Sequence, residues 1–171
     1  YSPSKGADLY RRSLYTYWKR TSPPPTMMIF DSAKRDVCAA RRQSTNTPLQ
    51  ALVLWNDPQF AEAARVLAVE MCTSKFPIEL AFKRLAGRRP LQLEVKALRQ
   101  LYQQELEVFR NNPDRAELVR SIGEFALPTA SDPASGAPEG GHQVAIDPAE
   151  HAAWTLVCSA LLSADPVTMI R

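Results

Sequence analysis

Hydrophobic residues recur every three or four positions along most of this 171-residue chain, which is the spacing of one face of an α-helix. The clearest stripe lies over residues 91–111, where its large apolar side chains oppose a charged face. Shorter stripes predict helices over 58–73 and 148–163. In that order, the stripe residues are Val95, Leu98, Tyr102, Leu106 and Phe109, then Phe60, Ala64, Leu67 and Met71, then Ala153, Trp154, Val157 and Leu161.

Prolines mark where several helices begin. Proline is tolerated at the first helical position, and a preceding Ser, Thr, Asp or Asn can cap the helix. This pairing occurs as Thr47-Pro48, Asp57-Pro58, Asn112-Pro113 and Asp147-Pro148. Gln50 and Glu150 follow two of these caps by three residues, which predicts capping boxes. With further helices over 77–86, ending at Gly87, and 113–122, the pattern predicts an all-α fold, an irregular bundle of about seven helices.

The first third of the chain gives a more varied pattern. Residues 8–20 predict a helix rich in aromatic residues, and Ser22-Pro23-Pro24-Pro25 predicts an extended Pro-rich spacer after it. Residues 27–30 (MMIF) then predict a short buried extended stretch, and Asp31 is a candidate cap for a helix over 32–42. The next helix covers 48–55. Near the other end, the Pro, Gly, Ala and Ser residues of 128–142 predict a mobile loop.

Composition adds limits to this picture. A chain of 171 residues can bury a real core, and we expect one domain over 1–171. Hydrophobic runs stay well below the roughly 18 residues that a membrane span needs. The three cysteines, Cys38, Cys72 and Cys158, lie too far apart for paired metal ligands, and we expect buried thiols, with one disulfide as the alternative. Trp55 and Trp154 are expected core anchors.

Charge is concentrated in residues 1–42, which carry nine Lys or Arg against Asp8, Asp31 and Asp36. Arg41 and Arg42 could cap the end of a helix and pair with Asp31, Asp36 or Asp57. They could instead form an anion-binding face, since the guanidinium suits bidentate contacts to carboxylate, sulfate or phosphate. Nucleic acid is an unlikely partner, because no recognisable binding module is present. Binding candidates are Arg11, Arg12, Arg41, Arg42, Asn46 and Trp18, with Lys34 and Arg35 nearby.

Catalytic signals are sparse. No nucleophile elbow, phosphate loop or nucleotide-binding glycine pattern occurs. Asp31, Asp36 and Asp57 could supply a carboxylate pair for glycoside chemistry, but their spacing does not require it. His142 and His151 lie near Asp147, yet the expected loop gives no rigid geometry, so we predict no metal site. Catalytic residues therefore stay unknown, and we interpret Thr47, Pro48, Gln50, Asp57 and Pro58 as structural turn residues.

Three stretches carry a family resemblance: LYRRSLYTYWKRTSPPPTMMIFD (9–31), CAARRQSTNTPLQALVLWNDPQFAEAARVLA (38–68) and AAWTLVCSALLSADP (152–166). Together they resemble the C-terminal domain of unknown function of large planctomycete-type multidomain proteins, which often carry a cytochrome-c-like domain. The resemblance implies a C-terminal fragment of an exported, periplasmic protein. Any haem would belong to another domain, because this chain lacks an attachment motif. No reaction or site residues can be transferred, and the ending SADPVTMIR and the 128–142 loop depart from the family pattern.

These observations favour a non-catalytic binding or docking module without a cofactor of its own. Its basic N-terminal face would contact other domains of the parent protein or an anionic polysaccharide. One alternative is part of an extracellular polysaccharide-active enzyme that uses Asp31, Asp36 or Asp57 beside Arg41 and Asn46. The other is a purely structural element needed for folding of the parent protein.

Overall fold

The computed structural model describes residues 4–19, 21–33, 38, 40–41, 45–127 and 146–164. The chain divides into two compact units, residues 1–53 (unit 1) and 54–171 (unit 2). Helices and turns account for the secondary structure of the described residues, so the predicted all-α bundle is confirmed. The expectation of one domain stays a prediction. Among the described residues, no helix is long and apolar enough to span a membrane.

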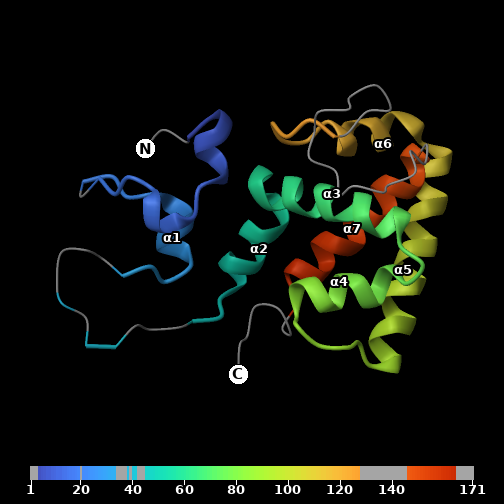
Figure 1. Ribbon diagram of the computed structural model, residues 1–171, viewed down its shortest axis with the longest axis horizontal. Helices are drawn as coiled ribbons and strands as arrows, with labels where there is room; N and C mark the ends of the chain where they lie inside the picture. Colours follow the sequence, from blue (N-terminus) through green and yellow to red (C-terminus); the bar gives the residue numbers. More distant parts are fainter. Residues whose placement is uncertain are drawn as a thin grey trace. The chain divides into compact units, whose positions relative to one another are not determined.

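Seven α-helices and two 3-10 helices make up the described structure (Figure 1). The 3-10 helices come first, at Gly6–Tyr10 (η1) and Ser13–Tyr15 (η2). The α-helices are Pro25–Ile29 (α1), Pro48–Asn56 (α2), Pro58–Thr73 (α3), Pro77–Leu85 (α4), Gln92–Asn111 (α5), Pro113–Arg120 (α6) and Pro148–Leu162 (α7). The boundary between the two units falls inside α2.

Proline is the first residue of every described α-helix except α5. Its φ angle is already helical, and its missing N–H would have had no partner there. The predicted aspartate caps are confirmed, because Asp57 accepts from the backbone N–H of Gln59 and Asp147 from that of Ala149. The predicted asparagine cap is wrong. The Asn112 amide donates to the Val108 carbonyl at 2.9 Å and so closes the end of α5 instead.

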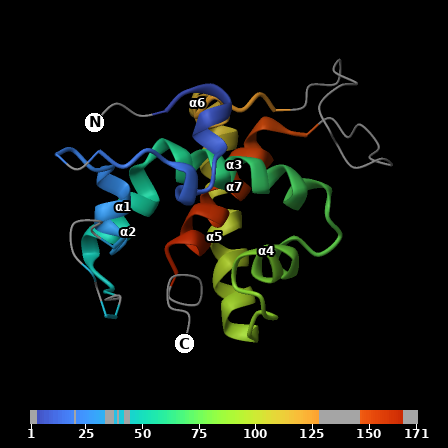
Figure 2. The same cartoon turned by 60° about the vertical axis from the view of Figure 1, so that its left-hand side comes forward.

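Helix α7 is the centre of unit 2 and packs against α3, α4, α5 and α6 (Figures 1 and 2). A helix that is buried all round needs apolar or small residues on every face, and α7 has them. Small alanines let the neighbouring helices approach, and Trp154 fills the space toward α5, where its ring stacks on that of Tyr102 with centroids 4.1 Å apart. The predicted stripe of α7 is confirmed, because Ala153, Trp154, Val157 and Leu161 are all buried.

Unit 1 is built differently. Among the described residues, all buried hydrophobic side chains lie between Leu54 and Leu161, outside unit 1. The buried residues described in unit 1 are Pro24 and Gln50. Local turns and polar contacts therefore order this unit more than a hydrophobic core does.

The predicted helix over 8–20 is wrong. The described residues form η1 and η2 instead, and Arg11 and Arg12 between them are extended, with ψ of 143° and 142°. Short helices in water are marginal unless an apolar face packs against something. Neither η1 nor η2 has a buried residue, so no packed apolar face stabilises a continuous α-helix in these two elements.

Two further predictions for unit 1 are wrong. Residues 27–29 were predicted to be extended, but they belong to α1. That helix begins at Pro25, so the last proline of the predicted spacer is already helical. Asp31 does not cap a helix over 32–42: its φ is +54°, and the described residues 32, 33, 38, 40 and 41 are not helical. The other residues of that range and the predicted mobile loop at 128–142 lie outside the described residues.

The thiols and tryptophans differ from one another in burial. Trp154 is buried as predicted, but Trp55 is 45% exposed, so its predicted role as a core anchor is wrong. It lies near the end of α2, directly after the buried Leu54. Cys158 is buried, Cys72 is half-buried and Cys38 is exposed, so the prediction of three buried thiols fails for Cys38. All three are free thiols.

We expect the three thiols to react at very different rates. Burial, followed by the charge of Glu150, raises the pKa of Cys72 to about 12, and burial also raises the pKa of Cys158. Because the thiolate is the reactive form, alkylation of both at pH 8 should be at least about a hundredfold slower than alkylation of Cys38. Mass spectrometry of the native chain during iodoacetamide treatment measures this. Equal rates in the native chain would contradict the described packing, and the unfolded chain is the control in which all three should react alike.

Candidate functional site

The predicted binding residues lie on several separate segments of unit 1. Arg11 and Arg12 lie between η1 and η2. Arg41 and Asn46 lie between α1 and α2, and Asn46 is two residues before α2 begins. All four are exposed, and Trp18 is half-buried. Arg11 is paired with Asp8 at 2.7 Å, so one predicted anion-binding group already has a carboxylate partner. Arg42, Lys34 and Arg35 lie outside the described residues.

Residues 10–19, which we name the aromatic-basic segment, combine three basic side chains with several large apolar ones. Leu14, Tyr15 and Tyr17 are 72%, 67% and 81% exposed, and Tyr10 is exposed as well. Arg11, Arg12 and Lys19 in the same segment are also exposed. Four exposed large apolar side chains within eight residues are unusual at a protein surface. Burying each of them would stabilise the chain by about 1.5–3 kcal/mol.

The turn before α2 is a polar network around Asp31, Gln50 and Thr45. The Asp31 carboxylate accepts from the backbone N–H and the hydroxyl of Thr45, both at 2.7 Å, and from the Gln50 amide at 3.3 Å. The same amide donates to the Ile29 carbonyl at 2.8 Å. This network joins the end of α1 to the start of α2, which are more than fifteen residues apart in sequence.

The predicted capping box of α2 is part of this network. The backbone N–H of Thr47 donates to the Gln50 side chain at 3.0 Å, and that of Gln50 points back at the Thr47 hydroxyl at 3.4 Å. Aspartate tolerates the left-handed conformation that Asp31 adopts, since its carboxylate can hydrogen-bond nearby backbone. Asn46 lies inside the turn but is exposed. The TNTPLQ stretch therefore connects α1 to α2 through the hydrogen bonds of Thr47 and Gln50.

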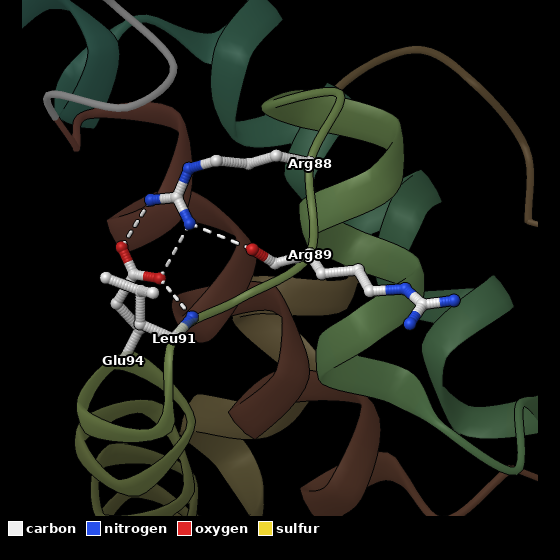
Figure 3. Close-up of polar contacts among 4 residues, drawn as sticks. All are labelled: Arg88, Arg89, Leu91 and Glu94. Carbon is white, nitrogen blue, oxygen red and sulfur yellow. Dashed lines mark hydrogen bonds and ion pairs between the residues drawn. The ribbon is translucent and has the colours of Figure 1, made fainter.

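An ion pair that the sequence pattern did not single out joins the segment after α4 to the first turn of α5 (Figure 3). Arg88 binds the Glu94 carboxylate through both terminal nitrogens, at 2.9 and 2.5 Å. Glu94 also accepts from the backbone N–H of Leu91 at 2.6 Å, which caps α5. The Arg88 guanidinium lies 5.1 Å from the centroid of the Phe82 ring. The hydrogen bond from Arg88 lowers the pKa of Glu94, and the contacts are those of a structural staple.

A second polar group lies where α3, α6 and α7 meet, and we name it the buried polar group: Glu62, Arg65 and His151 are buried, and Arg120 is half-buried. Glu62 and Arg65 lie one turn apart on α3 and contact the chain that follows α6. His151 on α7 is buried with Nε2 3.0 Å from the Arg65 carbonyl oxygen. Burial lowers the pKa of His151, and the charges of Arg120 and Arg65 lower it further. Among the described residues no cluster of potential metal ligands occurs, and this group holds none.

Residues 1–102 match the family model of PSD1, a protein of unknown function (DUF1553). The match covers more than half of the 171 residues. The chain belongs to the DUF1553 family. The part shared with this family spans unit 1, α2, α3, α4 and about half of α5, so it contains the aromatic-basic segment, the Asp31 network and the Arg88 staple. Neither a curated protein nor a solved structure matches the chain.

Two of the three carboxylates considered for glycoside chemistry have structural partners. Asp31 holds Thr45 and Gln50 within unit 1, and Asp57 caps α3 in unit 2. Asp36 lies outside the described residues. The buried polar group was missed from sequence, because Arg65 and His151 are 86 residues apart and only folding brings them together. A polar residue inside an apolar helical stripe, as in His151 beside Ala152 and Ala153, is the signal that could have found it.

Proposed function

We propose that this chain is a non-catalytic docking module. Its aromatic-basic segment binds an acidic protein surface, first of all on another domain of its own polypeptide. The observation that carries the proposal is the exposure of Leu14, Tyr15 and Tyr17 in a unit whose described residues bury no hydrophobic side chain. Tyrosine and arginine are the residue types that dominate binding energy at protein interfaces, and both are concentrated here.

A protein partner accounts for the segment better than a glycan does. Aromatic rings can stack on sugars, but the exposed Leu14 gains nothing from a hydrated polysaccharide and does gain from an apolar pocket. Exposed Arg12 and Lys19 would steer an acidic partner and fix its orientation. An anionic polysaccharide is therefore the alternative ligand that a test has to separate from protein.

The resemblance to planctomycete-type proteins gives this proposal its setting. In it, the chain would be the C-terminal part of an exported multidomain protein, and a haem, where present, would lie in a different domain. The partner surface would then belong to the same polypeptide. Linking the two would raise their effective concentration, so that even a weak direct contact would be populated.

Binding in trans tests the proposal. We expect the remainder of the polypeptide that its gene encodes to bind the 171-residue chain, as measured by calorimetry at 0.05 and 0.15 M salt. Changing Arg11 and Arg12 together to glutamate should weaken binding at least tenfold and reduce its salt dependence, because charge attraction becomes repulsion. Tyr15→Ala with Tyr17→Ala should weaken it at least tenfold at both salt concentrations, since ring burial depends little on screening.

The matched control is Leu93→Ala. Leu93 is 79% exposed on α5, as exposed as Tyr17, but it lies outside the aromatic-basic segment, so binding should stay unchanged. Parallel titrations use a sulfated polysaccharide, a uronic-acid polysaccharide and a neutral glycan. Binding to an anionic polysaccharide without binding to protein would replace the proposed partner. Tight protein binding that neither the arginine nor the tyrosine variant weakens would overturn the role of this segment.

A further inference from the structure

The chain that follows α6 is fastened to α3 by two buried side chains, and we name residues 121–127 the strap. Arg65 donates to the Arg120 carbonyl at 2.9 Å and to the Phe125 carbonyl. Glu62 accepts from the backbone N–H of Glu124 at 2.6 Å. Figures 1 and 2 show the strap in orange, beside α3. Most of its side chains are exposed, so few apolar contacts would be lost if it moved away.

His151 lies against the same fastening. Its Nε2 is 3.0 Å from the Arg65 carbonyl oxygen, which can only accept, so Nε2 carries the proton of the neutral ring. The other ring nitrogen, Nδ1, is buried without a hydrogen-bond partner. It is the only remaining place for a second proton. Among the described residues, no protein acceptor is bonded to that position.

Three charged side chains of the described residues act on His151: Arg65 of α3, and Arg120 and Glu117 of α6. Glu62 of α3 and Glu124 of the strap belong to the fastening itself. Arg120 is itself paired with Glu117 at 3.2 Å, and its Nε is buried without a partner. A second proton on His151 would therefore add a third cation near two guanidinium groups. The nearby carboxylate of Glu117 is already paired with Arg120.

We propose that His151 makes the strap acid-sensitive: when Nδ1 takes a proton, the repulsion from Arg65 and Arg120 releases the strap from α3. Release lets the buried Arg65 guanidinium reach water, which screens its repulsion of the imidazolium, at the cost of the hydrogen bonds to the Phe125 carbonyl and the Glu124 N–H. The core contacts of α7 with α3 and α5 stay in place, because they are apolar and do not involve the strap. The chain thus carries a local opening that acid drives.

The sign of the effect follows from proton linkage. In the closed form the pKa of His151 lies below its ordinary value near 6.5, chiefly because the ring is buried. The open form takes up the proton more readily, so opening grows as the pH falls below about 6.5. It grows by up to about tenfold for each pH unit until the closed form is protonated too. Above pH 7 both forms are neutral and pH has no effect through this residue.

Hydrogen exchange of the 171-residue chain at pH 7.0 and 5.0, corrected for the intrinsic rate, tests the proposal. The amide of Glu124, which donates to Glu62, reports directly on the fastening. We expect its opening equilibrium to rise at least tenfold at pH 5.0, while amides in the middle of α5 change less than twofold. Equal strap protection at both pH values would overturn the proposal. So would a simultaneous loss of protection in α3, α5 and α7, which would mean global unfolding.

His151→Gln removes the titration and keeps a donor, since the glutamine amide can still reach the Arg65 carbonyl. Its strap should not respond to pH, and a response equal to that of the wild type would overturn the role of His151. His142→Gln is the matched control, because it removes the other of the two histidines in the chain; it should respond like the wild type if the response comes from His151. Should the His151 variant not fold, Arg120→Gln provides the test. With one guanidinium removed, the acid response should shrink severalfold, and an unchanged response would contradict the proposal.

Discussion

Replacing Gly123 with alanine is expected to destabilise the chain by about 3 kcal/mol. Gly123 has φ of +90°, where a residue with a Cβ atom is strained by about 1–2 kcal/mol. A Cβ added there would lie 1.9 Å from the Glu62 carboxylate. Glu62 is buried and would have to give up its bond to Glu124, and a hydrogen bond to a charged group contributes about 1.5–3 kcal/mol.

Gly87→Ala is the matched control for this prediction. Gly87 also has a positive φ, +66°, but a Cβ added there would meet nothing within 4 Å. Its substitution should therefore cost only the backbone strain, about 1 kcal/mol. Urea unfolding of both variants beside the wild type measures the difference. Equal losses for the two glycines would mean that Glu62 does not fasten the strap.

Trp154→Ala should have the larger effect, a loss of about 3–5 kcal/mol, which is the usual cost of removing a buried large aromatic side chain. Trp154 is 6% exposed, stacks on Tyr102 and lies on the helix that all four neighbours in unit 2 contact. Trp55→Ala is the control, with an expected loss below about 1 kcal/mol, because Trp55 is 45% exposed.

Urea unfolding separates the two tryptophan variants. Combining each of them with a replacement of Trp18 leaves a single tryptophan, whose fluorescence reports on its environment. The emission of Trp154 should be the bluer of the two and should shift to the red on unfolding. A comparable loss for Trp55→Ala would show that the C-terminal end of α2 contributes to the core. That outcome would require revising the assignment of Trp55 to the surface.

Most of unit 2 could be predicted from the sequence because its signals are local. A proline fixes its own φ wherever it stands, and an aspartate before it reaches only two residues ahead, so Asp57 and Asp147 define helix starts without tertiary help. Gly87 stops α4 in the left-handed conformation for the same reason. The stripes of α3, α5 and α7 were also reliable, because each helix is long enough for its period to be seen.

Unit 1 could not be predicted so well, because its residues have strong side-chain chemistry but little to pack against. The segment around Arg11 and Arg12 has acceptable helix propensity, yet no buried face holds a helix there. Aspartate is a common helix-capping residue, but the Asp31 carboxylate accepts hydrogen bonds from Thr45 and Gln50 instead of capping a following helix. Propensity is a weak guide where tertiary contacts decide.

The candidate sites show the same division. The sequence left open whether the arginines of the aromatic-basic segment are exposed or paired; Arg11 and Arg12 are exposed, and Arg11 is paired with Asp8. The full membership of the buried polar group could not be predicted from the sequence, because its members come from α3, α6 and α7. A histidine next to alanines indicates burial, but the sequence does not say which arginines lie beside it.

The central position of α7 has a consequence for synthesis on the ribosome. The helix that fills the middle of unit 2 is also the last of the described helices to be made, about 75 residues after α3 ends. Until α7 leaves the exit tunnel, the apolar faces of α3, α4 and α5 lack the helix against which they pack. The nascent chain must therefore stay unaggregated with these stripes exposed, and unit 2 can close only once Leu162 has emerged.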